Sequence, residues 1–339
     1  MNNHSECTLS QRRKRPMDLV LYALIYLCAA FAVLLLAGII IYVLIRGVSS
    51  INWGFLTTVT SVRKGTVGIA GNIVNTILIV LLTMVIATPV GVGAAIYLNE
   101  YAKPGKLVSL IEFATETLSG IPSIIFGLFG MMFFGQTLGL GYSLLTGALT
   151  LILMVLPLIT RNTQEALKTV PNSYRHGAVG LGAGKWYTIR TILLPSSMPG
   201  IITGVILAIG RIVGESAALL FTAGSAKTLP KALAALFPKI FQSGGTMTIQ
   251  LYLSATSEGD FDTAFGIAVV LLVLVFLINL GTKRLAAKFD VMRKKNGTEN
   301  KNQREGSSFV LWRKSRIKGC QYGDSSKRCY SFYRSFRLW

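Results

Sequence analysis

Charged side chains are scarce in this chain, and acidic ones are scarcer than basic ones. Asp, Glu, Lys and Arg together make up 14% of the 339 residues, whereas hydrophobic residues make up 52%. A soluble fold is hard to reconcile with that balance. A bilayer core about 30 Å thick requires roughly 20 consecutive apolar residues per helix, and several such runs alternate with short polar stretches. The sequence therefore predicts an all-α, polytopic membrane protein.

The chain also lacks the usual patterns of a metal site. Its cysteines have no C-x-x-C spacing and no accompanying histidine pattern, and they stand at Cys7, Cys28, Cys320 and Cys329. Zinc sites normally show such spacing. We therefore expect no metal and no cofactor.

A Walker loop is missing as well. The motif G-x-x-x-x-G-K-[ST] is needed to cradle nucleotide phosphates. The nearest match is Gly184-Lys185, but Val179 takes the first glycine position and Trp186 takes the final hydroxyl position. No acid–base pair or nucleophile arrangement with catalytic spacing is found elsewhere. We predict that the chain is not an enzyme and that any ATP hydrolysis belongs to partner subunits.

Apolar runs predict six membrane helices. The first is too long for a signal-peptide core and is interpreted as a retained helix. The predicted spans are 19–45, 68–98, 118–134, 141–159, 200–221 and 263–285. Gly120 and Pro122 interrupt the third span, and Pro89 with Gly91 and Gly93 interrupts the second. Such residues commonly mark kinks or close helix contacts, although a role in a transport path is open for Gly120.

Basic residues predict the orientation. The net charge of +20 is typical of nucleic-acid binders, but here the basic residues lie between and beyond the apolar runs. Positively charged loops stay on the cytoplasmic side. Basic residues gather in the cluster at 12–15, in the second and fourth connections and after the last span. They predict that both termini lie in the cytoplasm and that the protein resides in the cytoplasmic membrane. We expect no nucleic-acid partner.

The longest predicted cytoplasmic connection, about 161–199, is too patterned for a linker. Pro171 can open a short helix, and Gly182 and Gly184 can close it. A second short helix is predicted through Trp186 toward Pro195. The alternative is an ordinary amphipathic loop.

This connection reads EALKTVPNSYRHGAVGLGAGKWYTIRTILLPSSMPGI and resembles the EAA loop of ABC importer permeases. The resemblance implies a short helix that docks in a groove of a cytoplasmic ATPase. Two positions depart from the family pattern, since His176 stands where glutamate is expected and Gly177 replaces the first alanine. The matching positions are Ala178, Gly182, Ile192, Leu194 and Pro195.

Arg211 and Glu215 lie four residues apart inside an apolar run. On a helix they would share one face, and membrane charges avoid lipid. Two hypotheses stay open. Arg211, whose planar fork suits phosphate oxygens, assists anion passage while Glu215 holds it in place, or the two form a structural ion pair.

The same span reads R-x-x-G-E-S followed by A-x-L-L-F-T-A, which resembles the A-type permeases of Pst phosphate importers. The stretches TPVGVGAAIYLNEYAKPG and LSGIPSIIFGLFG agree, and the resemblance runs from about residue 18 to 289. It implies a type I ABC importer permease fold. It also implies that the chain works with a C-type permease, an ATPase dimer, an extracytoplasmic phosphate-binding protein and phosphate. The alternatives are a permease for another solute such as sulfate or an amino acid, a secondary transporter or channel, and a structural anchor.

The ends of the chain differ from its centre. Residues 1–17 form a basic N-terminal segment, 18–289 the permease domain, and 290–339 a basic, aperiodic tail. Disorder is one interpretation of the tail. Codons permitted for 310–339, read one base later, can also encode a string that ends in GPSGCG and resembles the start of an ABC ATPase. The second hypothesis is therefore a frameshift into a neighbouring gene.

Overall fold

The computed structural model describes residues 16–61, 66–103, 105–229 and 236–284. Contacts divide the chain after Asn279, and the packing described below lies before that point. Most of the predicted N-terminal segment and all of the predicted tail lie outside the described residues.

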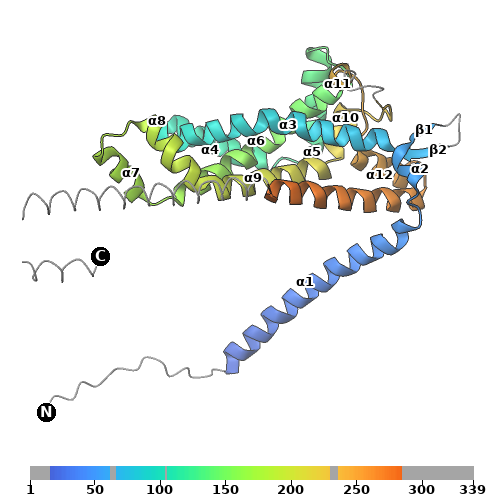
Figure 1. The fold of residues 1–339 in the computed structure, drawn as a ribbon, viewed down its shortest axis with the longest axis horizontal. Coiled ribbons are helices and arrows are strands. Elements are labelled where there is room, and N and C mark those ends of the chain that lie inside the picture. The colour runs from blue at the N-terminus through green and yellow to red at the C-terminus, as the bar shows by residue number, and fades with distance from the viewer. Residues whose placement is uncertain (1–15, 62–65, 104, 230–235, 285–339) are drawn as a thin grey trace, which may run out of the picture. The chain divides into compact units, whose positions relative to one another are not determined.

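Helices dominate the described chain, as predicted (Figure 1). The N-terminal half contains α1 (Pro16–Val48), α2 (Trp53–Thr57), β1 (Val59–Ser61), β2 (Thr66–Ile69), α3 (Ala70–Ile96), the π-helical turn η2 (Tyr97–Tyr101), α4 (Lys106–Ser119), α5 (Ser123–Gly130) and the π-helical η3 (Met131–Thr137). The remainder contains α6 (Leu144–Lys168), α7 (Asn172–Gly180), α8 (Lys185–Thr188), the π-helical η4 (Ile189–Leu193), α9 (Leu194–Gly214), α10 (Ala217–Thr222), α11 (Leu236–Lys239), α12 (Met247–Thr256) and a last helix, Phe261–Arg284. The two strands form an antiparallel hairpin that pairs Val59 with Ile69.

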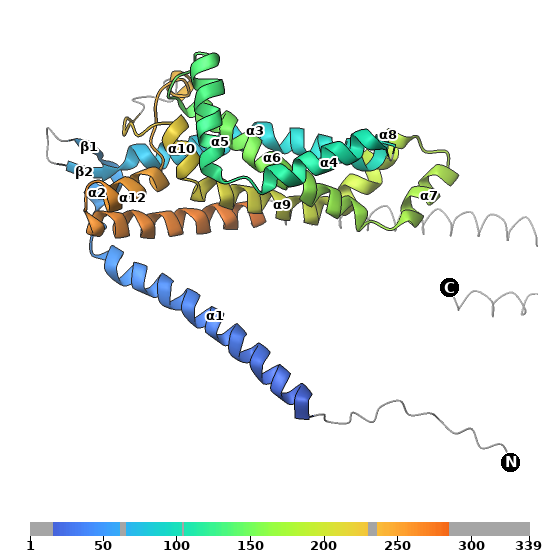
Figure 2. The ribbon, with the colours of Figure 1, turned by 180° about the vertical axis from the view of Figure 1, so that it is seen from behind.

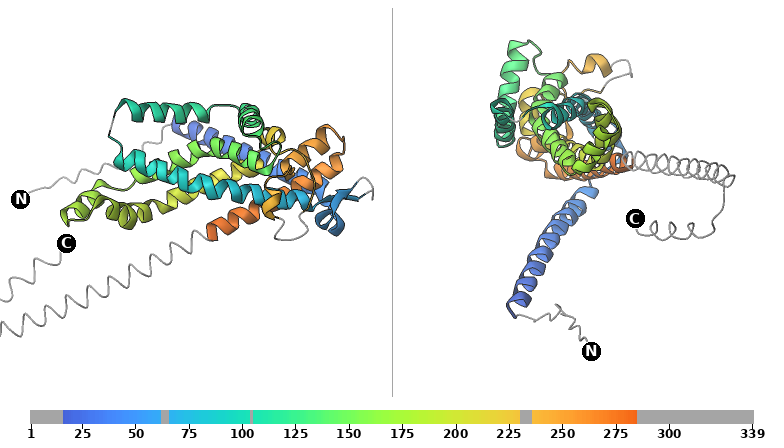
Figure 3. Two further views of the ribbon diagram at one scale, coloured as in Figure 1. Left: turned by 90° about the horizontal axis from the view of Figure 1, so that it is seen from above. Right: turned by 90° about the vertical axis from the view of Figure 1, so that its left-hand side faces the viewer.

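Helix α6 is the centre of the bundle. Of its most apolar window 67% is buried, against 28% for the span that begins with α3 and 33% for the span that ends with α9. It packs against α3, α5, α9 and α10, and the end-on view shows neighbouring helices around it (Figure 3). Fully buried apolar side chains such as Leu151 and Val155 form the core there together with Ala87 and Ala208.

Glycine allows two of these helix pairs to approach closely. A Cβ atom at Gly91 of α3 would lie 2.8 Å from Cγ2 of Ile159 in α6, and one at Gly127 of α5 would lie 2.8 Å from Cα of Ala218 in α10. Small residues make such contacts possible between membrane helices. Close contact is thus the role that Gly91 takes. Helix α3 continues through Pro89, so the predicted interruption of the second span is not present.

The third predicted span is bent. Helix α4 and the α5–η3 segment meet at 103° across residues 120–122 (Figure 2). Pro122 has a ψ of 139°, and a proline both removes a helical N–H and disfavours helix at the residue before it. The predicted interruption at Gly120 and Pro122 is therefore a sharp bend, and the helical segment starts earlier, at Lys106.

Among the described residues, five helices are long and apolar enough to cross a membrane, and the bent pair makes six if it counts as one span. The prediction of a polytopic all-α membrane fold is confirmed. The fourth span is longer than predicted, because α6 continues to Lys168. The fifth span is broken, because α9 ends at Gly214 and α10 begins at Ala217.

Candidate functional site

Helix α7 stands between two long helices, α6 and the continuous helix Lys185–Gly214. Pro171 precedes its first residue, and Gly182 follows it with a φ of +77°. Ala183 donates its N–H to the carbonyl of Ala178 at 3.0 Å, and left-handed glycine commonly ends a helix in this way. The predicted opening by Pro171 and closure near Gly182 agree with this structure.

The predicted second short helix is not separate. Residues from Lys185 onward form the first turns of the long helix that runs to Gly214. The helix passes Pro195 directly after the π-helical turn η4, and such turns absorb local irregularity. Ile192, Leu194 and Pro195 are therefore half-buried residues at the base of this helix.

Large apolar side chains are exposed in α7 and in the residues that follow it. His176 and Gly177 are also exposed, whereas Ala178 is buried and faces the rest of the chain. The large exposed side chains, with exposed fractions from 54% to 91%, are Tyr174, Val179, Leu181, Trp186 and Tyr187. Helix α7 lies outside the candidate membrane spans, so apolar side chains exposed there are available to a partner protein.

Beneath α7 lies a small apolar cluster. Leu167 and Val170, at and just after the end of α6, pack with Ile189 and Leu193 from the base of the long helix. Ile96, the last residue of α3, packs against them. Leu193 lies between Ile192 and Leu194, which match the EAA-loop pattern. The pattern itself includes neither Ile189 nor Leu193.

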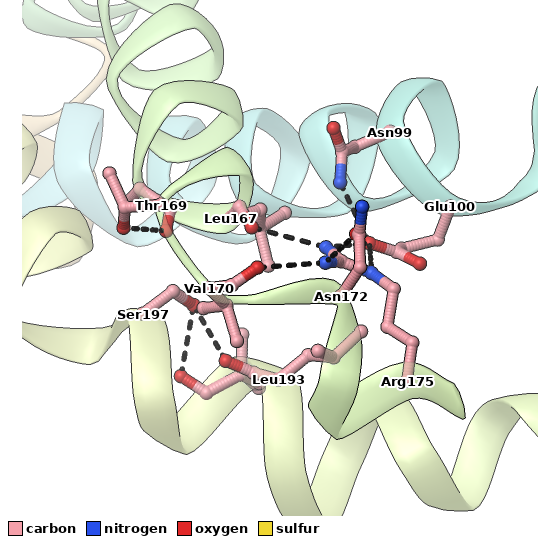
Figure 4. Close-up of polar contacts among 11 residues, drawn as sticks. Asn99, Glu100, Leu167, Thr169, Val170, Asn172, Arg175, Leu193 and Ser197 are labelled. Carbon is pink, nitrogen blue, oxygen red and sulfur yellow. Dashed lines mark hydrogen bonds and ion pairs between the residues drawn. The ribbon is translucent and has the colours of Figure 1, made fainter. Parts of the chain in front are cut away.

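Arg175 connects α7 to two other elements (Figure 4). Its Nε and Nη2 donate to Oε1 of Glu100 in η2 at 3.3 and 2.8 Å. Its Nη2 also donates to the carbonyl of Leu167 at 3.1 Å, and its Nη1 donates to the carbonyl of Val170 at 2.9 Å and to Oδ1 of Asn172 at 3.1 Å. A guanidinium has five N–H donors, and these contacts use all of them.

Burial makes this ion pair unusual for the chain. The side chains of Arg175 and Glu100 are 22% and 9% exposed, whereas those of the surface pair Arg161 and Glu116 are 55% and 72% exposed. Asn99 donates a further hydrogen bond to Glu100 at 2.7 Å. We call Glu100, Leu167, Val170 and Arg175 the α7 junction.

Sequence reasoning used Arg175 only as a basic residue that sets orientation. The chain has only 14 acidic residues, and one of them, Glu100, stands at the end of an apolar run. This position could have marked Glu100 as a residue with a specific partner. Its partner could not be found from spacing alone.

Arg211 and Glu215 do not pair in this structure. Because α9 ends at Gly214, Glu215 has an extended backbone and the shared helical face is lost. Its Oε1 accepts the N–H of Ala218 at 3.2 Å, and its carbonyl accepts the hydroxyl of Thr248 at 2.9 Å. Within the described ranges, no hydrogen bond or ion pair involves Arg211, which is exposed. The predicted ion pair is thus replaced by a cap on α10.

At the other end of α3, two buried amides hold the segment that follows α10. Asn72 Nδ2 donates to the carbonyls of Gly245 and Thr246 at 3.0 and 3.3 Å. Asn75 Nδ2 donates to the same Gly245 carbonyl at 3.1 Å and to that of Ala226 at 3.5 Å. We call these the α3 amide contacts.

A buried lysine lies in the same segment. Lys239 donates to the hydroxyl of Thr228 and to the carbonyl of Ser243, the latter at 3.2 Å. Burial lowers the pKa of Lys239, since desolvation disfavours the charged form. Across the part of the chain that the structure describes, no cluster of three or more His, Cys, Asp or Glu residues could hold a metal ion.

Comparisons with known proteins agree with this architecture. A probable ABC transporter permease protein of Bacillus subtilis, YqgI, is 36% identical over 271 residues, which cover 76% of this chain and 91% of that protein. A phosphate transport system permease protein, PstA, of Xylella fastidiosa is 33% identical over 244 residues, with 71% and 82% covered. A solved bacterial alginate ABC transporter matches 80% of this chain and 95% of its own chain with a TM-score of 0.61 at 14% identity, which bears on the fold alone.

The family model for binding-protein-dependent transport system inner membrane components matches residues 87–291. That match covers α7, the α7 junction and both charges of the fifth span. This chain therefore belongs to the family of binding-protein-dependent transport system inner membrane components.

Proposed function

We propose that this chain is a transmembrane subunit of an ATP-driven phosphate importer. It forms the transport path together with a C-type permease, couples to a dimer of ATPase subunits, and receives phosphate from an extracytoplasmic binding protein. It resides in the cytoplasmic membrane with both termini in the cytoplasm. The observation that carries the proposal is α7, a short helix outside the candidate spans with exposed apolar side chains in it and just after it.

The ATPase is the partner that fits α7. A short helix that enters a groove of its partner is a common mode of recognition, and Tyr174 and Val179 of α7 and Leu181 just after it are exposed apolar side chains for such a contact. His176 and Gly177 are exposed beside them. Ala178 faces inward, so its place in the motif serves the attachment of α7 and not the docking contact.

Phosphate is proposed as the solute because several relatives at 32–36% identity are named phosphate transport system permeases. Sulfate is the discriminating competitor. The test is uptake of radiolabelled phosphate into proteoliposomes that hold the assembled complex, with ATP inside and binding protein outside. We expect ATP-dependent phosphate uptake that excess sulfate does not reduce. Uptake of sulfate in place of phosphate would reject this solute, and uptake driven by an ion gradient without ATP would reject the importer class.

Arg211 is the residue that we propose to meet the anion. An exposed arginine at the end of a membrane helix is costly against lipid, by roughly 2.5–3.5 kcal/mol at mid-membrane. It should therefore face a water-filled path or a partner subunit. The break between α9 and α10 beside it is the kind of discontinuity that lines transport sites in membrane proteins.

Substitution tests this role. We expect Arg211→Gln to reduce phosphate uptake about tenfold or more, since one charge-assisted contact is worth about 1.5–3 kcal/mol, and Arg211→Lys to retain part of it. Uptake is measured at matched membrane abundance. Unchanged uptake in both variants would mean that Arg211 has a purely structural role.

A further inference from the structure

The α7 junction contains more than an ordinary loop requires. Helix α7 buries only Ala178 among its own residues, so apolar packing contributes little to its attachment. Its hydrogen bonds to other elements come mainly from one side chain, that of Arg175, which reaches Glu100 and two carbonyls at the end of α6. Among side chains of α7, the Arg175 guanidinium therefore makes the main polar attachment to other elements.

Each partner of Arg175 is itself fixed. The carbonyl of Leu167 lies in the last turn of α6 and that of Val170 just after the helix, where a cation is favoured by the helix dipole. Leu167 and Val170 also belong to the apolar cluster with Ile189 and Leu193. Glu100 is held by Asn99. Movement of α7 must therefore either carry these elements along or break the junction.

Glu100 stands near one end of a long rigid rod. The continuous helix Ala70–Tyr101 has 32 residues, which corresponds to about 48 Å at 1.5 Å per residue. Close contact between Gly91 and Ile159 holds this helix against α6 about two thirds of the way along it. The α3 amide contacts join its other end to the segment around Gly245.

We infer that Arg175 and Glu100 form the joint through which displacement of α7 is passed to α3, and along α3 to the segment that Asn72 and Asn75 hold at its far end. The inference rests on the proposed function, in which α7 receives the ATPase. Both residues are positioning residues, since neither contacts the solute. A contiguous set of packed and hydrogen-bonded groups can carry coupling between distant sites.

Chemistry favours an ion pair at such a joint. Buried ion pairs add little net stability compared with apolar residues, but they demand one geometry. A planar fork with five donors fixes both the distance and the direction between α7 and η2. A lysine at position 175 would keep the charge and lose that direction, which provides a test of positioning as distinct from charge.

The experiment uses the complete complex with its ATPase and second permease. Spin labels are placed at Ser173 on α7 and Val85 on α3, both exposed, after replacement of the native cysteines. Pulsed electron paramagnetic resonance then measures the distance between the labels without nucleotide and with trapped nucleotide. Phosphate transported per ATP hydrolysed is measured on the same unlabelled complexes in proteoliposomes.

In the wild-type complex we expect one narrow distance that is the same in both nucleotide states, because α7 and α3 move together. In Arg175→Lys and Glu100→Gln we expect a broadened distance that changes with nucleotide. Transport per ATP should fall at least about fivefold, the lower range of typical coupling effects, while the ATPase still co-purifies. Arg161→Gln, which breaks the exposed pair with Glu116, is the matched control and should match the wild type.

The outcomes separate this inference from the proposed function. If no ATPase co-purifies with the wild type, the proposed function fails and the inference fails with it. If the wild-type complex transports phosphate but both variants keep the wild-type distance and the same transport per ATP, only the inference is overturned. If neither variant assembles, the wild-type distance still decides, since a distance that changes with nucleotide overturns the joint and a constant one supports it.

Discussion

The two ends of the second membrane helix are attached by different chemistry. At its C-terminal end, Glu100 meets the charged fork of Arg175, and at its N-terminal end Asn72 and Asn75 donate neutral amide hydrogen bonds to backbone carbonyls. The charged end is partly exposed, at 22% for the Arg175 side chain, whereas Asn72 and Asn75 are at most 1% exposed.

The difference indicates that the two ends of this helix have different roles. A buried amide contact is a fixed attachment, because no solvent is at hand to replace the hydrogen bonds that it would lose. A partly solvated ion pair at an apolar, exposed helix can respond to a partner that pulls on it. The N-terminal end thus holds its segment, and the C-terminal end receives movement.

The largest effect on stability is expected from removal of the Arg175 guanidinium. Arg175→Ala leaves Glu100 without its cation, and because the pair is partly solvated the loss should stay below the roughly 3–5 kcal/mol of a fully buried pair. Thermal unfolding of the purified complex measures the loss. The double variant Arg175→Ala with Glu100→Ala removes the stranded charge and should recover part of the stability. Losses of Arg175→Ala and Glu100→Ala that simply add up to the loss of the double variant would show that the charges do not interact.

The contact between Gly91 and Ile159, near the C-terminal end of α3, offers the next largest effect. In Gly91→Val, new side-chain atoms must enter space held by Ile159, only 2.8 Å from the Cβ position. Overpacking of this kind costs about 1–3 kcal/mol, so α3 and α6 should separate and the melting temperature should fall. Gly93→Ala is the matched control, because nothing lies within 4 Å of its Cβ position. A Gly91 variant as stable as the control would show that this contact does not hold α3 against α6.

The amide end should respond in stability and not in coupling. Asn72→Ala removes two buried hydrogen bonds and leaves carbonyls with fewer donors, for a loss of about 1–3 kcal/mol that the complex shows as a lower melting temperature. Transport per ATP should stay at the wild-type value in the fraction that remains assembled. Thr117→Ala, an exposed hydroxyl that bonds its own helix, is the control. A drop in transport per ATP without a drop in stability would show that the N-terminal end of α3 acts in coupling and not in attachment.

The smallest effect is expected at the exposed ion pair. Arg161→Gln breaks contacts to Glu116 at 3.4 Å and to Glu165 at 3.5 Å, and solvent-exposed pairs contribute about 0–1 kcal/mol. The melting temperature should hardly move. A loss as large as that of Arg175→Ala would show that burial is not what distinguishes the α7 junction.

Local signals in the sequence predicted local structure well. Apolar runs gave the membrane helices, Pro171 and Gly182 marked the two ends of α7, and Gly120 with Pro122 marked a real break. The angle of that break, 103°, depends on how α4 and α5 pack against α6 and could not be predicted. Pro89 is the counterexample, because neighbouring helices allow α3 to continue through it.

Contacts between residues far apart in the chain could not be predicted from the sequence. Arg175 and Glu100 are 75 residues apart in the chain, so no spacing rule connects them, although each carries an unusual charge for its surroundings. Arg211 and Glu215 misled for the opposite reason. Their spacing suggested a pair only if the helix continued, and the break after Gly214 gave Glu215 a different partner, the N–H of Ala218.

In the proposed complex, the exposed side of α7 and the residues just after it contact the ATPase. A photo-crosslinking amino acid at Leu181, which is 91% exposed, tests it directly in membranes that hold the assembled complex. The control position is Leu138 at the end of η3, which is 56% exposed. We predict a crosslink to the ATPase from Leu181 and none from Leu138. A crosslink to the ATPase from Leu138 and none from Leu181 would contradict this account.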